Sequence, residues 1–438
     1  MKKIIIKGST KLSGVVQIQG AKNSAMKHIF VPLIAQDEFI LKNIPRIGST
    51  IKHLDLMKFQ GADIDWIDKN SVKINCRNIS TSKKIPEDLF YYTSDANKII
   101  PILVSKFGKC KVEINPERTD RGGDQIGSRK FDEIIPTLKT LGIESKYKSE
   151  RLIEFRLSST YPYKYKAPIK SFTLSVLALF SALFKKGTSE ISNHITIPEF
   201  MDIVNLLIAS GARIKLTKNK IFVQGPTKLK GITYTNINDV HDFVTWMSAG
   251  LSTNSNLLIE DVDYEKMGLK PLDVVLKKMN VKIDLHQQKI ALLPQLEKMK
   301  GTKIIAGTYP DFVTEWQVLI SPLLTQIKGE SKVIETLYAN RMQHWNEMRK
   351  MGIQFKFFQD PKYPEVESLP RAVKINGNQK LYGAKVDARD VRTGAALVIA
   401  GLVAKGDTEI ENIEHIERGY ENLVGRLRSL GANIKYSH

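Results

Sequence analysis

Cysteine is scarce in this chain, which has only Cys76 and Cys110 among its 438 residues. Two cysteines are too few for a disulfide framework or for a thiolate cage around a metal ion. The eight histidines include no HExxH pair and none at ligand spacing from a cysteine. We therefore expect two inert thiols and neither a structural nor a catalytic metal.

Long apolar runs are also missing. No stretch approaches the roughly 18 apolar residues that a membrane-spanning helix needs. The first ten residues, MKKIIIKGST, have three consecutive isoleucines, which is too short a run for a secretory signal. These absences predict a cytoplasmic protein with no membrane partner.

Acidic residues are outnumbered, with 46 Asp and Glu against 66 Lys and Arg and a net charge of +20. Such an excess is typical of nucleic-acid binding or of an anionic metabolite as substrate. The lysines are scattered, however, and no block of five or six like charges, zinc-finger spacing or RNP motif occurs. We expect mainly a lysine-rich solvated surface, then an anionic small-molecule substrate, and no nucleic-acid partner.

A sequence pattern recurs six times, roughly every 70–80 residues: an amphipathic helix, a turn residue, and an alternating strand. Gly or Asn at the turn accepts the left-handed conformation that closes a helix, and the period of two predicts a strand. The turn residues are Gly61, Gly142, Gly211, Asn280, Gly352 and Gly431. Units of this length exceed solenoid repeats of about 20–50 residues. We expect a globular α/β protein that grew by duplication, with three units in each domain.

Six motifs are spaced along these repeats: GAKNSAMKHI, NPERTDRGGDQIGSRKFDE, TYPDFVTEWQ, YANRMQHWNEM, VDARDVRTGAALVIAGL and HIERGYENL. In this order they resemble the enolpyruvyl transferase family from about residue 5 to residue 436. The branch that acts on UDP-N-acetylglucosamine is closer than the branch that acts on shikimate 3-phosphate. The resemblance implies two inside-out α/β domains of three pseudo-repeats each, and an active site in an interdomain cleft that closes on substrate by induced fit.

The resemblance also implies that one domain interrupts the other. Residues 22–235 would form the first domain and carry the catalytic loop at about residues 115–129. Residues 1–21 and 236–438 would form the second. No pattern in the sequence fixes the oligomeric state, although a monomer is slightly favoured.

Four cations match family ligands of phosphoenolpyruvate, which carries a phosphate and a carboxylate: Lys22, Arg129, Arg392 and Arg418. A lysine at a helix N-terminus can reach an anion that the helix dipole also favours, and a guanidinium fork binds two oxygens at once. Asp390 belongs to the same Asp-x-Arg motif as Arg392, which the resemblance implicates in ordering the closed state.

The glycine-rich loop GGDQIG, residues 122–127, has Asp124 where the family usually has cysteine. An acid that protonates the enol carbon must hold its proton near neutral pH, and free Asp has a pKa of about 3.9. Burial on closure could raise that pKa, so Asp124 or Lys22 would deliver the proton. Fosfomycin, which alkylates the family cysteine, should form no adduct here.

The acceptor side carries the candidate base. Glu315 stands where the family has aspartate, and its additional methylene displaces the carboxylate by about a bond length, which can matter at a reacting centre. The resemblance implies that Glu315 also contacts the acceptor. The other implied acceptor contacts are Asn23, Asp132, Ser171, Asn340 and Arg341.

Three departures leave the acceptor open. Ser94 stands where the family has an arginine, Ile197 replaces a polar contact, and the crossover segment INDVHD has no arginine. The implied reaction is enolpyruvyl transfer from phosphoenolpyruvate to a hydroxyl of UDP-N-acetylglucosamine, with phosphate release and without a cofactor. It is the first committed step of peptidoglycan precursor synthesis. Two alternatives remain: transfer to another uridine nucleotide such as UMP in secondary metabolism, or a catalytically weak paralogue with a binding or regulatory role.

Overall fold

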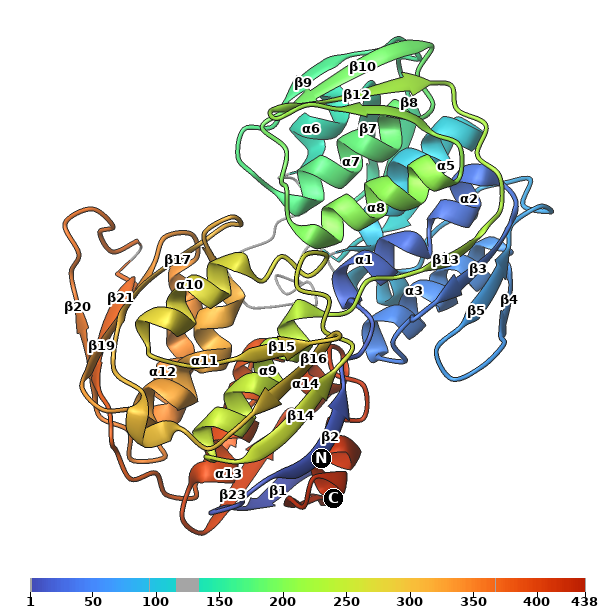
Figure 1. Cartoon of the computed structure of the whole chain (residues 1–438). Coiled ribbons are helices and arrows are strands. Elements are labelled where there is room, and N and C mark those ends of the chain that lie inside the picture. Colours follow the sequence, from blue (N-terminus) through green and yellow to red (C-terminus); the bar gives the residue numbers. More distant parts are fainter. Residues whose placement is uncertain (1, 94, 116–133, 367, 438) are drawn as a thin grey trace. The chain divides into compact units, whose positions relative to one another are not determined.

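The computed structural model describes the chain except for residues 1, 94, 116–133, 367 and 438 (Figure 1). The described residues form two compact units. One, the split unit, comprises residues 1–19 and 238–438. The other, the continuous unit, lies within residues 20–237. No helix among these residues is both long and apolar enough to cross a membrane.

The six-fold repeat is visible in the backbone. Each copy has an inner helix, a strand, a second helix and then one or two further strands. The six predicted turn residues all have positive φ: Gly61 108°, Gly142 77°, Gly211 105°, Asn280 60°, Gly352 83° and Gly431 93°. The prediction of left-handed helix ends is therefore confirmed, and each unit contains three copies.

The continuous unit contains α-helices, a short 3-10 helix (η1) and eleven of the strands that are described. Its helices are α1 (Lys22–His28), α2 (Val31–Ala35), α3 (Gly48–Gln60), α4 (Glu87–Tyr91), η1 (Ala96–Lys98), α5 (Ile99–Phe107), α6 (Ile135–Thr140), α7 (Phe172–Ala182) and α8 (Pro198–Ala209). Its strands are β3 (Glu38–Lys42), β4 (Asp63–Trp66), β5 (Val72–Asn75), β6 (Lys109–Glu113), β7 (Ile143–Ser149), β8 (Leu152–Leu157), β9 (Lys164–Lys166), β10 (Gly187–Ser192), β11 (Arg213–Leu216), β12 (Lys220–Gly225) and β13 (Thr233–Thr235), the last two short ones, β9 and β13, serving as edges.

The split unit repeats the arrangement. Its helices are α9 (Val240–Ser252), α10 (Lys270–Lys278), η3 (Leu296–Lys298), α11 (Thr314–Gln326), η4 (Ala339–Gln343), α12 (His344–Arg349), α13 (Val391–Val403), α14 (Glu414–Glu417) and α15 (Leu423–Ser429). Its strands are β1 (Lys3–Lys7), β2 (Ser13–Gln17), β14 (Asn256–Glu260), β15 (Asp284–His286), β16 (Lys289–Leu292), β17 (Lys303–Gly307), β18 (Phe312–Val313), β19 (Glu330–Glu335), β20 (Phe355–Phe358), β21 (Ala372–Asn376), β22 (Lys385–Asp387), β23 (Asp407–Glu411) and β24 (Asn433–Ser437).

In the part of the chain that the structure describes, each unit has three small sheets. Their strand orders are β13-β3-β5-β4, β6-β8-β7 and β11-β12-β10-β9 in the continuous unit, and β15-β16-β14-β2, β18-β17-β19-β21-β20 and β22-β23-β1-β24 in the split unit. The N-terminal strand β1 pairs with both β23 and β24, and β2 pairs with β14. These pairings explain why the first residues belong with the C-terminal half of the chain.

The core of each unit is made of helices, with the sheets outside (Figure 1). Every residue of α9 is buried, as are residues 391–402 of α13, so both helices are enclosed on all sides. Strand β1 alternates between buried and more exposed residues, as a sheet with one solvated face does. Helices on the inside and half-solvated sheets on the outside are the predicted inside-out α/β architecture.

Candidate functional site

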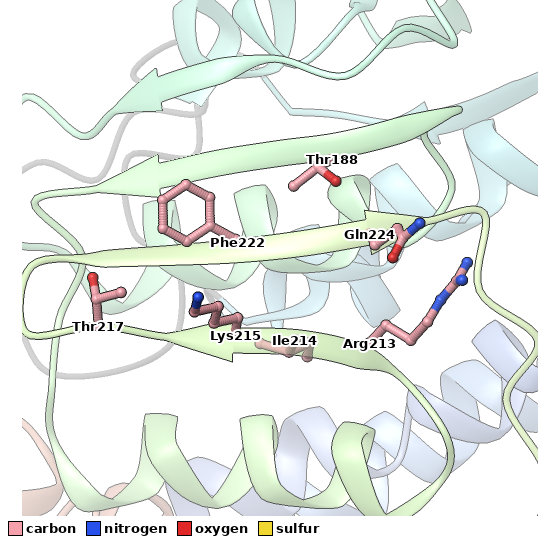
Figure 2. A pocket seen from close by; sticks show the side chains of 7 residues that line it. All are labelled: Thr188, Arg213, Ile214, Lys215, Thr217, Phe222 and Gln224. Carbon is pink, nitrogen blue, oxygen red and sulfur yellow. The ribbon is translucent and has the colours of Figure 1, made fainter.

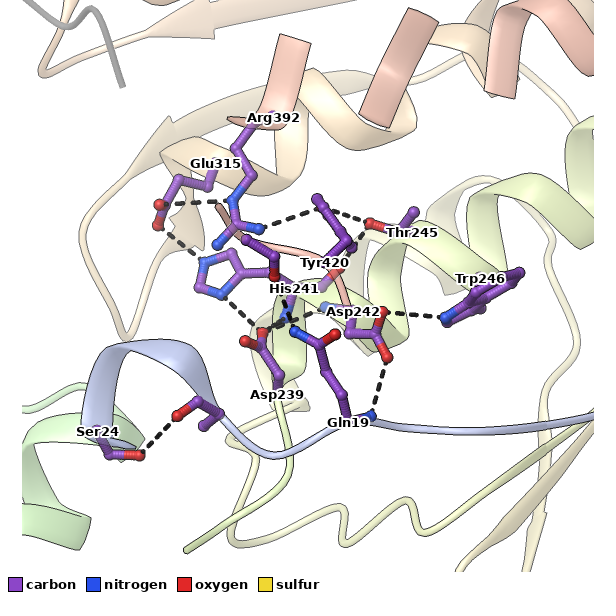
Figure 3. Close-up of polar contacts among 12 residues, drawn as sticks. Gln19, Ser24, Asp239, His241, Asp242, Thr245, Trp246, Glu315, Arg392 and Tyr420 are labelled. Atoms are coloured by element: carbon purple, nitrogen blue, oxygen red, sulfur yellow. Dashed lines mark hydrogen bonds and ion pairs between the residues drawn. The ribbon is translucent and has the colours of Figure 1, made fainter. Parts of the chain in front are cut away.

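Three inner helices of the split unit, α9, α11 and α13, pack against one another and place polar first turns together. Their bodies are almost wholly apolar or buried, so polar side chains at their starts stand out. His241, Glu315 and Arg392 come from these three first turns and point toward one another (Figure 3). Helix N-termini carry partial positive charge, so this end of the unit favours anions.

Two aspartates cap the helices that carry the cations. Asp239 Oδ1 accepts hydrogen bonds from the backbone N–H of His241 at 2.8 Å and of Asp242 at 3.2 Å. Asp390 Oδ1 accepts from the backbone N–H of Arg392 at 2.9 Å and of Thr393 at 2.8 Å. Each cap satisfies backbone donors that a helix start leaves open, and it fixes the residue two positions later.

Glu315 lies at the centre of this cluster. Its Oε2 is 2.8 Å from Nε2 of His241, while its Oε1 lies 3.8 Å from Arg392 Nε and 3.8 Å from Arg341 Nη2. Burial alone would raise the pKa of Glu315, but the three cations hold that pKa well below its usual value. Glu315 is therefore a carboxylate at neutral pH.

His241 lies between two carboxylates. Its Nδ1 is 3.3 Å from Asp239 Oδ1, and its side chain is 3% exposed. Burial lowers the pKa of His241 and Arg392 lowers it further, but Glu315 and Asp239 together raise it to about 9. The ring is therefore an imidazolium near neutral pH, with an N–H on each nitrogen.

Arg392 is held from its other side. Its Nη1 donates to the hydroxyl of Tyr420 at 3.1 Å, and that hydroxyl is 2.8 Å from Thr245 Oγ1 (Figure 3). Burial raises the pKa of Tyr420 to about 12, so the phenol stays neutral. Arg392 is 2% exposed, and its guanidinium is held by Tyr420 from the segment after α14, which Thr245 of α9 contacts in turn.

The segment that carries Arg418 is hydrogen-bonded to Gln19 and packs against the start of α13. Gln19 donates from Nε2 to the carbonyl of Gly419 at 2.8 Å and accepts at Oε1 from the backbone N–H of Glu421 at 2.8 Å. A Cβ on Gly419 would lie 2.3 Å from Val391 Cγ1, so only glycine lets this segment approach the start of α13. Arg418 is 9% exposed and lies two residues before Tyr420, whose hydroxyl accepts a hydrogen bond from Arg392.

Asn340 and Arg341 lie on η4, directly after a buried acid. Glu335 accepts a hydrogen bond from the Thr314 hydroxyl and, at Oε1, from the backbone N–H of Leu337 at 2.8 Å and of Tyr338 at 3.1 Å. Burial raises the pKa of Glu335. This acid links the start of α11 to the turn before η4 and so fixes Arg341 relative to Glu315.

The continuous unit carries three predicted residues at helix starts. Lys22 and Asn23 open α1 and are both half-buried. Ser171 caps α7, where its hydroxyl accepts from the Leu174 N–H at 3.4 Å. This cap gives the Ser171 hydroxyl a structural role at the start of α7.

A second cluster of ionised side chains, formed by one aspartate and two lysines, lies inside the continuous unit. Asp95 contacts Nζ of Lys27 at 2.9 Å through Oδ2 and Nζ of Lys98 at 2.7 Å through Oδ1. Both lysine side chains are 0% exposed, and Lys98 also donates to Thr173 Oγ1 at 2.9 Å. The pKa of Asp95 is well below its usual value, since the two ammonium groups outweigh its burial. The sequence-based view of scattered lysines as surface residues is therefore wrong for these two, because an internal carboxylate pairs them.

The structure thus brings together Glu315, Arg341 and Arg392, with Asp390 capping the helix that carries Arg392. Asp124, Arg129, Asp132 and Ser94 lie outside the described residues. Sequence reasoning missed His241 and its cap Asp239. The internal repeat carried the signal, since DVH at residues 239–241 matches DVR at residues 390–392.

The described residues of the continuous unit also form a surface hollow. A hollow lies on the solvent face of the β11-β12-β10-β9 sheet (Figure 2), and its lining is Thr188, Arg213, Ile214, Lys215, Thr217, Phe222 and Gln224. None of these was predicted as a site residue.

Burial raises the pKa of Cys76 and of Cys110 to about 12, so neither thiol ionises near neutral pH. The described part of the chain holds no group of three or more His, Cys, Asp or Glu that could bind a metal.

Sequence comparisons cover nearly the whole chain. The family model for EPSP synthase (3-phosphoshikimate 1-carboxyvinyltransferase) matches residues 6–427. UDP-N-acetylglucosamine 1-carboxyvinyltransferase of Halothermothrix orenii is 31% identical over 443 residues, which is 99% of either chain. UDP-N-acetylglucosamine 1-carboxyvinyltransferase 2 of Listeria monocytogenes is 30% identical and covers 99% of this chain and 98% of its own length.

Solved structures share the fold at lower identity. The enolpyruvyl transferase NikO from Streptomyces tendae has a TM-score of 0.87 at 20% identity and covers 100% of this chain and 99% of its own. An EPSP synthase from Acinetobacter baumannii has a TM-score of 0.75 at 15% identity and full coverage of both chains. These matches confirm the predicted fold of two inside-out α/β domains.

Proposed function

The chain belongs to the EPSP synthase family of enolpyruvyl transferases, and on that premise we propose that it transfers the enolpyruvyl group of phosphoenolpyruvate to a hydroxyl of UDP-N-acetylglucosamine. Inorganic phosphate is the second product. Such a product would serve peptidoglycan precursor synthesis, the role that the resemblance to the family implies. The reaction needs no redox step, so the proposal includes no cofactor.

The observation that carries this proposal is the ionised Glu315 among buried cations. A carboxylate beside Arg341 and Arg392 suits a reaction in which a hydroxyl loses its proton next to a substrate that carries both a phosphate and a carboxylate. The arginines stabilise negative charge on the substrate, and their burial strengthens that effect, since the local dielectric is low.

The proposed reaction consists of an addition step and an elimination step. The acceptor oxygen bonds to C2 of phosphoenolpyruvate as Glu315 takes the hydroxyl proton, and C3 gains a proton to become a methyl group. The tetrahedral intermediate then loses one C3 proton and inorganic phosphate, which restores the double bond as an enolpyruvyl ether. In this proposal Lys22, Arg129, Arg392 and Arg418 bind the phosphate and carboxylate, and Asp124 or Lys22 supplies the proton to C3.

The acceptor contacts remain part of the proposal. Asn23, Asp132, Ser171, Asn340 and Arg341 are the residues that we assign to the nucleotide sugar. The substitutions at Ser94 and Ile197 and the missing crossover arginine favour testing a smaller uridine nucleotide as well. UMP is therefore the second candidate acceptor.

Phosphate release tests the proposal. The purified chain is incubated with phosphoenolpyruvate and, separately, UDP-N-acetylglucosamine, UMP or shikimate 3-phosphate, with an Arg418→Ala variant alongside. Release with the first acceptor, and its loss in the variant, is the expected result. Release with UMP alone would replace the acceptor, and release with none of the three would refute the proposed reaction.

A further inference from the structure

The cluster in the split unit contains a side chain, His241, that has no role in the proposed reaction. We infer that His241 is a positioning residue for the base: it holds Oε2 of Glu315 so that Oε1 is the oxygen that takes the acceptor proton. This inference rests on the proposed function, because it assigns the geometry of the same proton transfer.

The two oxygens of Glu315 have different surroundings. Oε2 accepts a hydrogen bond from His241 at 2.8 Å. Among the described residues no hydrogen bond reaches Oε1, whose guanidinium neighbours stand 3.8 Å away. The Glu315 side chain is 20% exposed, whereas His241 is 3% exposed. One oxygen is therefore anchored inside the unit while the residue keeps access to solvent.

A glutamate base gains from such an anchor. Its side chain has one more rotatable bond than aspartate, so its carboxylate can occupy more positions. Misplacement of a reacting group by about 1 Å can cost roughly 100-fold in rate. A hydrogen bond from a buried, capped histidine removes much of that freedom before the acceptor arrives.

Charged groups from three elements hold the ring of His241. Within the described part of the chain they are Asp239, which caps the same helix, Glu315 from α11 and Arg392 from α13. Arg341 from η4 lies on the far side of Glu315. Asp242, the next acid on α9, pairs instead with Arg426 at 2.8 Å. The ring therefore has a carboxylate for each nitrogen, which sets its orientation.

A neutral isostere separates positioning from a structural role. The glutamine in His241→Gln can place an amide N–H donor near the position of Nε2 but carries no charge. Glu315 therefore keeps a hydrogen-bond donor and loses the positive charge of the imidazolium. In His241→Gln we expect the acid limb of the kcat/KM profile to move to higher pH, because the carboxylate becomes easier to protonate. His241→Leu, which also loses the donor, should lower kcat about tenfold or more with KM for phosphoenolpyruvate unchanged.

His28→Gln is the matched control. His28 is also buried, and its Nε2 lies 3.4 Å from Asp202, but it belongs to the continuous unit, whereas Glu315 belongs to the split unit. Its substitution should leave the acid limb where it is in the wild type. Equal, pH-independent losses in His241→Gln and His28→Gln would overturn the inference, since a merely structural histidine behaves that way.

A titration without turnover distinguishes this inference from the function on which it rests. The imidazole of His241, followed by NMR, should titrate at lower pH in Glu315→Gln than in the wild type. An unchanged titration would refute the pairing in solution. If the pairing holds but the wild type releases no phosphate with any acceptor, the failure lies with the proposed reaction, and the positioning role falls with it.

Discussion

The ion pair between His241 and Glu315 should make the stability of the split unit depend on pH. The ordinary pKa of histidine is about 6.5, and in the folded chain the pKa of His241 is raised to about 9. A pKa raised by folding adds stability that is complete below the unfolded value and is lost as pH rises through the folded value. At 1.36 kcal/mol per pH unit, this difference corresponds to about 3 kcal/mol between pH 6 and pH 10.

Glu315 acts in the opposite pH range. Its pKa is depressed, so its contribution is present above about pH 4.5 and lost only in acid. Alkaline titration therefore isolates His241. Substituting His241→Gln removes the titrating ring while other groups, such as Lys185 with its pKa lowered to about 8 by burial, titrate equally in both proteins.

Urea unfolding followed by tryptophan fluorescence is a suitable assay. Three of the four tryptophans, Trp246, Trp316 and Trp345, are buried in the split unit, so the signal reports mainly on that unit. The wild type should lose up to about 3 kcal/mol more than His241→Gln between pH 6 and pH 10. Parallel pH dependences in the two proteins would refute the reasoning that the ring is charged by its two carboxylates.

Three further predictions concern Asp95, Asp390 and Asp124. Asp95→Asn removes the carboxylate that pairs with the buried Lys27 and Lys98, and it should lower the stability of the continuous unit by about 3–5 kcal/mol in urea unfolding. Adding Lys98→Met to this variant should recover part of the lost stability. No recovery would contradict the argument from buried charge. Asp390→Ala removes the cap of α13 and should cost about 1 kcal/mol, measured the same way, with a stability equal to wild type counting against it. Fosfomycin should leave the intact mass unchanged, and a covalent adduct at Asp124 would disprove that expectation.

Local rules of chain conformation account for what the sequence predicted of the fold. A helix that closes in the left-handed region accepts few residue types, so Gly61 and Asn280 could be identified as helix ends from the sequence. The alternation of apolar residues after each turn then indicated half-solvated strands. Such signals are short in sequence and need no knowledge of distant partners.

The polar clusters depend on distant partners, so periodicity does not reveal them. His241 and Glu315 are 74 residues apart in sequence, and neither is unusual in its own segment. Glu315 and Arg392 were found only because their motifs resemble a family. Lys27 and Lys98 look like surface lysines until Asp95 is placed between them, since burial of a lysine depends on its partner.

Product analysis tests the central claim most directly. Equimolar phosphoenolpyruvate and UDP-N-acetylglucosamine are incubated with the purified chain, and phosphorus NMR and mass spectrometry follow the same sample. The proposed function predicts inorganic phosphate in a one-to-one ratio with an acceptor that has gained one enolpyruvyl group. Release of phosphate without formation of the modified acceptor would contradict this proposal. So would the absence of both products when UDP-N-acetylglucosamine and UMP are each tested.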